Sequence, residues 1–308
     1  MPDSGEISFM DGSSQSLDAL PYHRALRDYL LTHESDLWRW FASAKAQEEY
    51  TEHLRLELLK AAYRLDAESH PDLFRVADEA RERLGLSHIP LTLYQLQHST
   101  QLNAALYYIP NEAHVVFSGP VLSLLNTEEL QSLLGHELAH YHLWQQDEGE
   151  FLIADRLLQA VANDPRASAS HHQSARWFQL YTEIFADRGS LSVTREIRPV
   201  VSGLVKMQTG LAQVSAASYL KQAEEIFERS KVKTDEVSHP EAYIRARALS
   251  LWSEGRADAD EQIGHIIEGA AALDDLDLLG QVRVTGLTRK LLGAFLQPKW
   301  FHTEAVLG

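Results

Sequence analysis

The chain has 308 residues, enough for one large domain or two ordinary ones. Its 28 Lys and Arg against 44 Asp and Glu give a formal net charge of −16, which by bulk charge disfavours nucleic acid and anionic membranes as partners. There is no cysteine, so disulfides, thiolate metal sites and a cysteine nucleophile are excluded, and any metal must be bound by His and carboxylates.

The N-terminal residues 1–20 lack the basic start and the continuous apolar stretch of a secretory signal, and we expect them to be loosely ordered. The most apolar candidate for a membrane span, FLIADRLLQAVA, is short and is interrupted by Asp155 and Arg156. The sequence therefore predicts a soluble, cytoplasmic protein with no integral membrane segment. It does not predict the oligomeric state.

Residues 21–88 form an N-terminal helical region in this interpretation. Apolar residues recur there at three- and four-residue steps up to about Leu84, which predicts three or four amphipathic helices. The pattern changes at Ile89. Three β-branched and aromatic runs follow, with Pro110-Asn111 between the last two, so we expect a small sheet with one hairpin.

Helical periodicity resumes after Gly119. Asn126 with Glu129 three residues later has the arrangement of a capping box, and the helix it begins should run to about Gln146. Further helices should follow, interrupted at 163–165, near Gly210, at 238–240 and near Gly255. The fold class we expect is α+β and predominantly helical, as one unit with a small sheet before its central helix.

The central helix carries H-E-x-x-H. Residues four apart differ by about 40° around a helix axis, so His136 and His140 project from one side and can reach the same ion. Zinc accepts neutral imidazole and, in a catalytic site, keeps one position for water. Glu137, next to the first ligand, can take a proton from that water and pass it to the leaving amine.

The alternative is a surface helix that carries two histidines by chance. Against it, an apolar stripe on the same helix predicts that the helix is buried, which places the histidine pair at the edge of the core. The stripe consists of Leu130, Leu133, Leu134, Leu138 and Tyr141. His142 falls well over 100° from the midpoint of the pair, so we expect it to be structural or exposed.

The third ligand decides the type of zinc site. The Gly and His that a metzincin has three and six residues after its second histidine are Leu143 and Gln146 here. A carboxylate from a later helix is the natural third ligand, and Glu183 and Asp187 lie on one face at i and i+4. Glu183 has the longer reach, which leaves Asp187 to orient a ligating histidine, unless both are ordinary solvated carboxylates.

These segments together resemble the zinc metallopeptidases of the CAAX prenyl endopeptidase and HtpX-like family over roughly residues 90 to 250. The matching segments, in order, are Asn103-Ala104, Val115-Val116-Phe117-Ser118-Gly119, Glu128-Glu129-Leu130, H-E-L-A-H at 136–140, Glu183-Ile184-Phe185-Ala186-Asp187, and His239-Pro240 with Arg245. Many family members are embedded in membranes, so the prenylated substrates of one branch are not transferred to this chain.

The resemblance implies a gluzincin site in a zincin-like fold. It implies one zinc ion per chain on His136, His140 and Glu183, and Glu137 as the base in peptide-bond cleavage. Asn103 and Ala104 would line the strand along which an extended polypeptide substrate docks. His239 would donate to the developing oxyanion, and Arg245 would act through a carboxylate.

We therefore expect four parts of the chain: a flexible segment at 1–20, a helical region at 21–88, a zinc peptidase core at 89–255 and C-terminal helices packed on that core at 256–308. The predicted function is a metalloendopeptidase acting on extended or unfolded polypeptides. The alternative is a catalytically degenerate helical interaction protein with a structural zinc site. The intact Glu137 argues against the alternative, as does a ligand set of only three residues.

Overall fold

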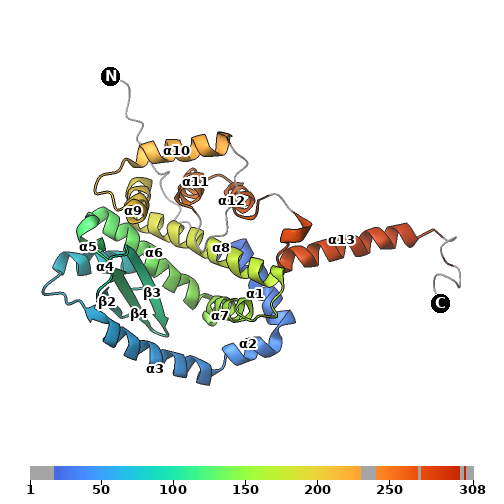
Figure 1. Cartoon of the computed structure of the whole chain (residues 1–308), viewed down its shortest axis with the longest axis horizontal. Helices are drawn as coiled ribbons and strands as arrows, with labels where there is room; N and C mark the ends of the chain where they lie inside the picture. The colour runs from blue at the N-terminus through green and yellow to red at the C-terminus, as the bar shows by residue number, and fades with distance from the viewer. Residues whose placement is uncertain (1–16, 230–240, 270–271, 299–301, 303–308) are drawn as a thin grey trace.

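The computed structural model describes residues 17–229, 241–269, 272–298 and 302. It is α+β and predominantly helical with one small sheet, as the sequence predicts (Figure 1). The N-terminal helices are α1 (Pro21–His33), α2 (Ser35–Phe41), α3 (Ala44–Ala61) and α4 (Pro71–Arg83). Of the segment expected to be loosely ordered, residues 1–16 lie outside the described residues, whereas Ala19 and Leu20 are buried.

The sheet has four strands in the order β1-β2-β4-β3. The strands are β1 (Ala62–Arg64), β2 (Leu91–Leu96), β3 (Asn103–Ile109) and β4 (Glu112–Ser118). β2 and β4 are parallel, and the other two pairs are antiparallel. β1 is not predicted from the sequence, because three residues directly after a helix are too few to display a period of two.

The predicted hairpin joins β3 and β4. Ile109 pairs with Glu112, so Pro110 and Asn111 form its two-residue loop. Asn111 has a φ of 64°, a left-handed conformation that asparagine tolerates better than most residues. The turn places β3 at one edge of the sheet.

Both faces of the sheet are covered, which explains the unbroken apolar run in β4. Val115 and Phe117 belong to a core cluster with residues of α4 and of the central helix, α6 (Thr127–Gln145). Val116, between them, faces the opposite way and belongs to a cluster with residues of α3. A strand buried on both faces needs apolar side chains at consecutive positions.

The capping box predicted for α6 is present. The Asn126 side chain accepts a hydrogen bond from the Glu129 backbone N–H at 2.9 Å, and the Glu129 carboxylate accepts one from the Asn126 N–H, also at 2.9 Å. Leu134, Leu138 and Tyr141 are fully buried in the cluster beneath the sheet. The helix is therefore fixed by its first turn and by its apolar side.

The remaining helices are α5 (Val121–Leu124), α7 (Glu150–Ala162), α8 (Ala169–Thr194), α9 (Ile197–Thr209), α10 (Ala216–Arg229), α11 (Ala242–Ser253), α12 (Ala259–Glu268) and α13 (Leu278–Leu296). The breaks predicted near Pro165, Gly210 and Gly255 are present, and the one at 238–240 lies outside the described residues. The break at Arg195 was not predicted, because no Gly or Pro marks it. No described helix is both long and apolar enough to cross a membrane.

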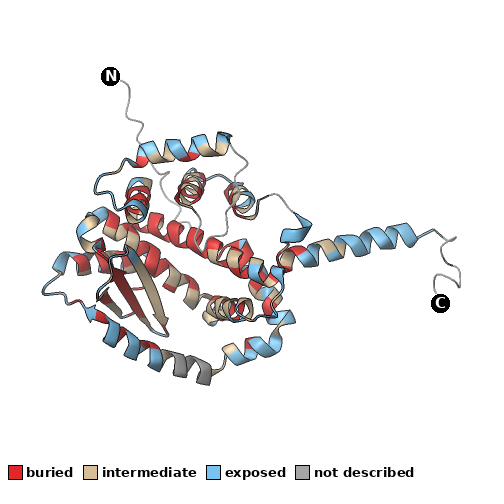
Figure 2. Ribbon diagram, in the orientation of Figure 1, coloured by how far each residue is buried: buried red, intermediate tan, exposed pale blue. Residues whose placement is uncertain are grey.

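α6 and α8 cross closely in the middle of the molecule, and Figure 2 shows them as the most continuously buried helices. Small residues make this approach possible. A Cβ added to Gly189 would lie 2.2 Å from the Cβ of Ala139, and one added to Gly135 would lie 3.0 Å from the Cβ of Val193. Gly135 directly precedes His136, so this close contact sets the distance between α6 and α8 at the position of His136.

Candidate active site

A cavity of about 500 Å³ opens between β3 and the helices α6, α8 and α9. Most of the site residues predicted from the sequence line this cavity. Those lining it are Asn103, Ala104, His136, Glu137, His140, Glu183, Asp187 and Arg245. His239 lies outside the described residues. The structure thus brings together side chains from four separate parts of the chain.

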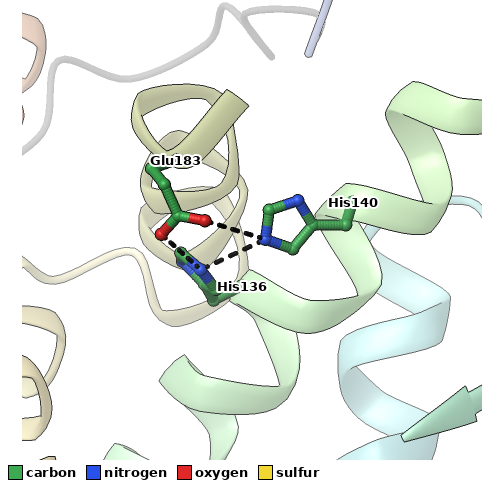
Figure 3. Close-up of side chains that lie close together, drawn as sticks. All are labelled: His136, His140 and Glu183. Atoms are coloured by element: carbon green, nitrogen blue, oxygen red, sulfur yellow. Dashed lines mark hydrogen bonds and ion pairs between the residues drawn. The ribbon is translucent and has the colours of Figure 1, made fainter. Parts of the chain in front are cut away.

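His136, His140 and Glu183 converge on one point (Figure 3). The two Nε2 atoms are 3.3 Å apart, and Glu183 places Oε2 at 3.5 Å from His136 Nε2 and Oε1 at 3.7 Å from His140 Nε2. Donors about 2.0–2.1 Å from a tetrahedral zinc ion are about 3.3–3.4 Å apart. The three side chains therefore fit a zinc ion, with the carboxylate slightly wide of the ideal spacing.

Asp187 lies one helical turn after Glu183 and contacts the other nitrogen of His136. Its Oδ1 is 3.1 Å from His136 Nδ1. Arg245, from α11, donates two hydrogen bonds to Asp187, at 2.8 Å to Oδ2 and 2.6 Å to Oδ1. A bidentate guanidinium holds a carboxylate in one orientation, so the pair fixes the His136 ring.

The charges around the histidines favour a cation. Burial alone would lower the pKa of His136, but hydrogen bonds with Asp187 and Glu183 outweigh it and raise that pKa to about 10. Burial and the neighbouring His136 lower the pKa of His140 to about 4. In the absence of metal, the carboxylates thus hold a proton on one imidazole, and a divalent cation can neutralise the same carboxylates instead.

Glu137 also lines the cavity, and only 5 % of it is exposed. Burial raises the pKa of its carboxyl group, and the negative charge of Glu183 adds to the effect. The charge of His136 and a backbone hydrogen bond from Leu106 in β3 act in the opposite direction. A raised pKa makes this carboxylate a stronger base, which favours its accepting a proton from water.

Sequence reasoning missed the far side of the cavity. α9 contributes Val200, Gly203, Leu204 and Met207 to its lining. The buried Lys206 Nζ donates to Glu129 Oε2 at 2.8 Å and so fastens α9 to the first turn of α6. Glu129 and Lys206 are 77 residues apart, so no local sequence pattern predicts that they form a pair. His142, which we expected to be structural or exposed, contacts the Leu17 carbonyl oxygen at 3.1 Å and does not line the cavity.

The close crossing leads to a prediction about metal affinity. Gly189→Ala should push α8 away from Ala139, destabilise the fold by about 1–3 kcal/mol and weaken zinc binding, because Glu183 lies on the displaced helix. Urea unfolding with chelator and a zinc titration measure the two effects. Gly286→Ala is the matched control, since nothing lies within 4 Å of its added Cβ. Unchanged zinc affinity in Gly189→Ala would mean that the crossing does not set the ligand spacing.

A buried helix with H-E-x-x-H next to a small sheet, and a carboxylate supplied by a later helix, define a metallopeptidase of the zincin-like class. The chain belongs to Peptidase family M48, which it matches over residues 67–253. Members of this family are metal-dependent hydrolases, and the chain contains a suitable His-His-Glu group.

One relative is the plastoglobule-localized metallopeptidase 48, chloroplastic, of Arabidopsis thaliana. It is 28% identical over 158 residues, which cover 45% of this chain and 45% of the relative. The chain thus matches somewhat less than half the length of that protein. This likeness agrees with the family.

Proposed function

We propose that the protein is a zinc-dependent endopeptidase that hydrolyses peptide bonds in extended or unfolded polypeptides. The observation that carries the proposal is the convergence of His136, His140 and Glu183 in one cavity with the buried carboxylate of Glu137. The resemblance to the HtpX-like branch of the family also favours this substrate class. The cytoplasmic location stays a prediction.

Each side chain has a distinct role in the proposed reaction. His136, His140 and Glu183 would hold the ion, which would polarise the substrate carbonyl and lower the pKa of water towards about 7. Glu137 takes a proton from the attacking water while the water oxygen bonds to the carbonyl carbon. It then gives a proton to the leaving amine nitrogen as the C–N bond breaks. Asp187 and Arg245 keep the His136 ring in position.

We further propose that the substrate docks as an added strand beside β3. This strand is at the edge of the sheet, and its residues Asn103, Ala104, Ala105 and Leu106 line the cavity. Main-chain pairing along an edge gives affinity with little demand on sequence. In a crystal of Glu137→Gln with a bound peptide, the peptide backbone should therefore pair with residues 102–106. A peptide bound elsewhere, or a strict sequence requirement in a peptide library, would contradict the strand-addition model.

The apolar part of the cavity suggests a modest side-chain preference. Leu125, Leu133, Leu204 and Met207 line it together with Val200. A peptide library should therefore show enrichment of apolar residues at one position next to the cleaved bond, with other positions tolerant. Burial of one such side chain is worth about 1.5–3 kcal/mol, enough for a measurable preference.

The experiment that tests the function is cleavage of unfolded casein by zinc-loaded protein. We expect cleavage, loss of cleavage with a chelator, and recovery when zinc is returned. A protein that binds zinc and cleaves neither casein nor itself would instead support the interaction protein with a structural zinc site. Analysis of the cleavage products by mass spectrometry distinguishes internal cleavage from removal of terminal residues.

A further inference from the structure

α13 is firmly attached to the body of the protein at its first turn. Asp277 caps it by accepting a hydrogen bond from the Gly280 N–H at 2.7 Å, and the buried Tyr22 hydroxyl donates to the same carboxylate at 2.8 Å. The Leu278 N–H donates to Ser174 Oγ at 2.9 Å, which ties the helix to α8. Leu278 is buried in the core. The direction of α13 is therefore fixed where it starts.

Beyond this anchored turn α13 leaves the body of the protein. Figure 1 shows it as a projecting arm, and Figure 2 shows most of that arm as exposed. Large apolar side chains are nevertheless frequent on it. Those exposed by more than half, with exposed fractions, are Val282 51%, Leu287 60%, Leu291 69%, Leu292 51% and Phe295 61%. Such a density of exposed apolar residues usually marks an interaction surface.

The charges of α13 are of one sign and gather on one side. The helix contains Arg283, Arg289 and Lys290 and no Asp or Glu. At about 100° per residue, the three cations fall within a sector of about 120°. Leu287, Leu291 and Leu292 fall in the remaining sector, which is broad and contains most of the apolar residues. The arm is thus amphipathic, with a wide apolar side and a basic side.

We propose that α13 docks in the plane of an anionic lipid bilayer, with its apolar side among the acyl chains and its cations at the headgroups. A broad apolar side, with charged residues that are all basic on the other side, is typical of helices that lie in a membrane interface. A coiled coil with a second copy of the chain would favour a narrower stripe. Insertion across the bilayer would bury the cations, whereas lying flat keeps them at the surface.

The net charge of −16 opposes contact between the whole chain and an anionic surface, but the projection of α13 reduces this repulsion. A helix of 19 residues is about 28 Å long, and charges in about 0.15 M salt are screened over about 8 Å. Arg289 and Lys290 lie about 16 Å along the helix from the anchored first turn, which is about two screening lengths, so the outer part of the arm presents its own positive charge to the headgroups away from the acidic body.

The test is flotation of the whole 308-residue chain with vesicles of phosphatidylcholine alone or with one quarter phosphatidylglycerol, in about 0.1 M salt. Binding should be at least about tenfold stronger to the anionic vesicles. Two double variants should each weaken binding to the anionic vesicles at least about tenfold. One combines Leu287→Glu with Leu291→Glu, and the other combines Arg289→Glu with Lys290→Glu. High salt should weaken wild-type binding.

Matched controls separate the arm from general surface effects. Leu56→Glu with Leu59→Glu changes two exposed leucines of α3, at 51% and 61% exposure, and should leave vesicle binding unchanged. Equal loss in this control, or equal binding to both kinds of vesicle, would overturn the proposal. A dimer of the wild-type chain in light scattering, converted to a monomer by the double variant Leu287→Glu and Leu291→Glu, would also overturn the proposal. In that case a second copy of the chain would occupy the apolar side of α13. Casein cleavage is measured separately and does not affect this result.

Discussion

Glu137→Gln should lower kcat for casein or a reporter peptide by about 10²–10⁴-fold while the zinc content stays at about one ion per chain. The amide keeps the size of the side chain in its buried position but cannot accept the proton from water. KM should change little, because Glu137 is proposed to act on the water and not on the bound peptide. Elemental analysis and initial rates on the same sample provide both measurements.

The control for this variant is Glu128→Gln on the same helix. The Glu128 side chain is 64% exposed and does not line the cavity, so its removal should leave kcat within about twofold. A Glu137→Gln protein that keeps both its zinc and most of its peptidase activity would rule out the proton-transfer role. Loss of zinc in that variant would instead place Glu137 among the ligands.

His140→Ala should release the zinc ion and abolish cleavage. Loss of a group that only orients a ligand costs about 10–100-fold in metal affinity, so loss of a ligand should cost more than about 100-fold. Zinc should also raise the unfolding temperature of the wild-type protein but not of this variant, because only the folded wild-type site binds the ion tightly. Elemental analysis and thermal scans with and without zinc measure these effects.

His142→Ala provides a matched control two residues along the same helix. Its imidazole contacts the Leu17 carbonyl oxygen and does not approach the His-His-Glu group. The His142→Ala substitution should therefore lower the stability of the fold but leave zinc bound. Full zinc occupancy in His140→Ala, or equal loss of zinc in both variants, would show that the ligand assignment is wrong.

The sequence predicted the parts of the molecule that rest on local patterns. The capping box at Asn126, the two-residue turn at Pro110-Asn111 and the period of the apolar residues on α6 each act within a few residues. H-E-x-x-H gave the histidine pair for the same reason. The short strand β1 and the helix end at Arg195 were missed, because the first depends on pairing with β2 and the second has no Gly or Pro to mark it.

The spacing between helices could not be predicted from local patterns. Gly189 looks like an ordinary helix residue in the sequence, and only its approach to Ala139 explains why it has no side chain. The same applies to Lys206, whose buried partner Glu129 lies 77 residues earlier. A buried ion pair of this kind is visible only once two helices have been placed side by side.

The cavity draws its proposed chemistry and its apolar lining from different helices. α6 and α8 supply the His-His-Glu group, whereas much of the apolar surface belongs to α9, which the Glu129–Lys206 pair holds in place. For protein engineering, this division means that, under the proposed function, Leu204 and Met207 would be the positions to vary in a library that redirects cleavage towards other peptides, while the ligand helices stay unaltered. Glu129 and Lys206 should be kept constant in such a library, since every variant depends on them for the position of α9.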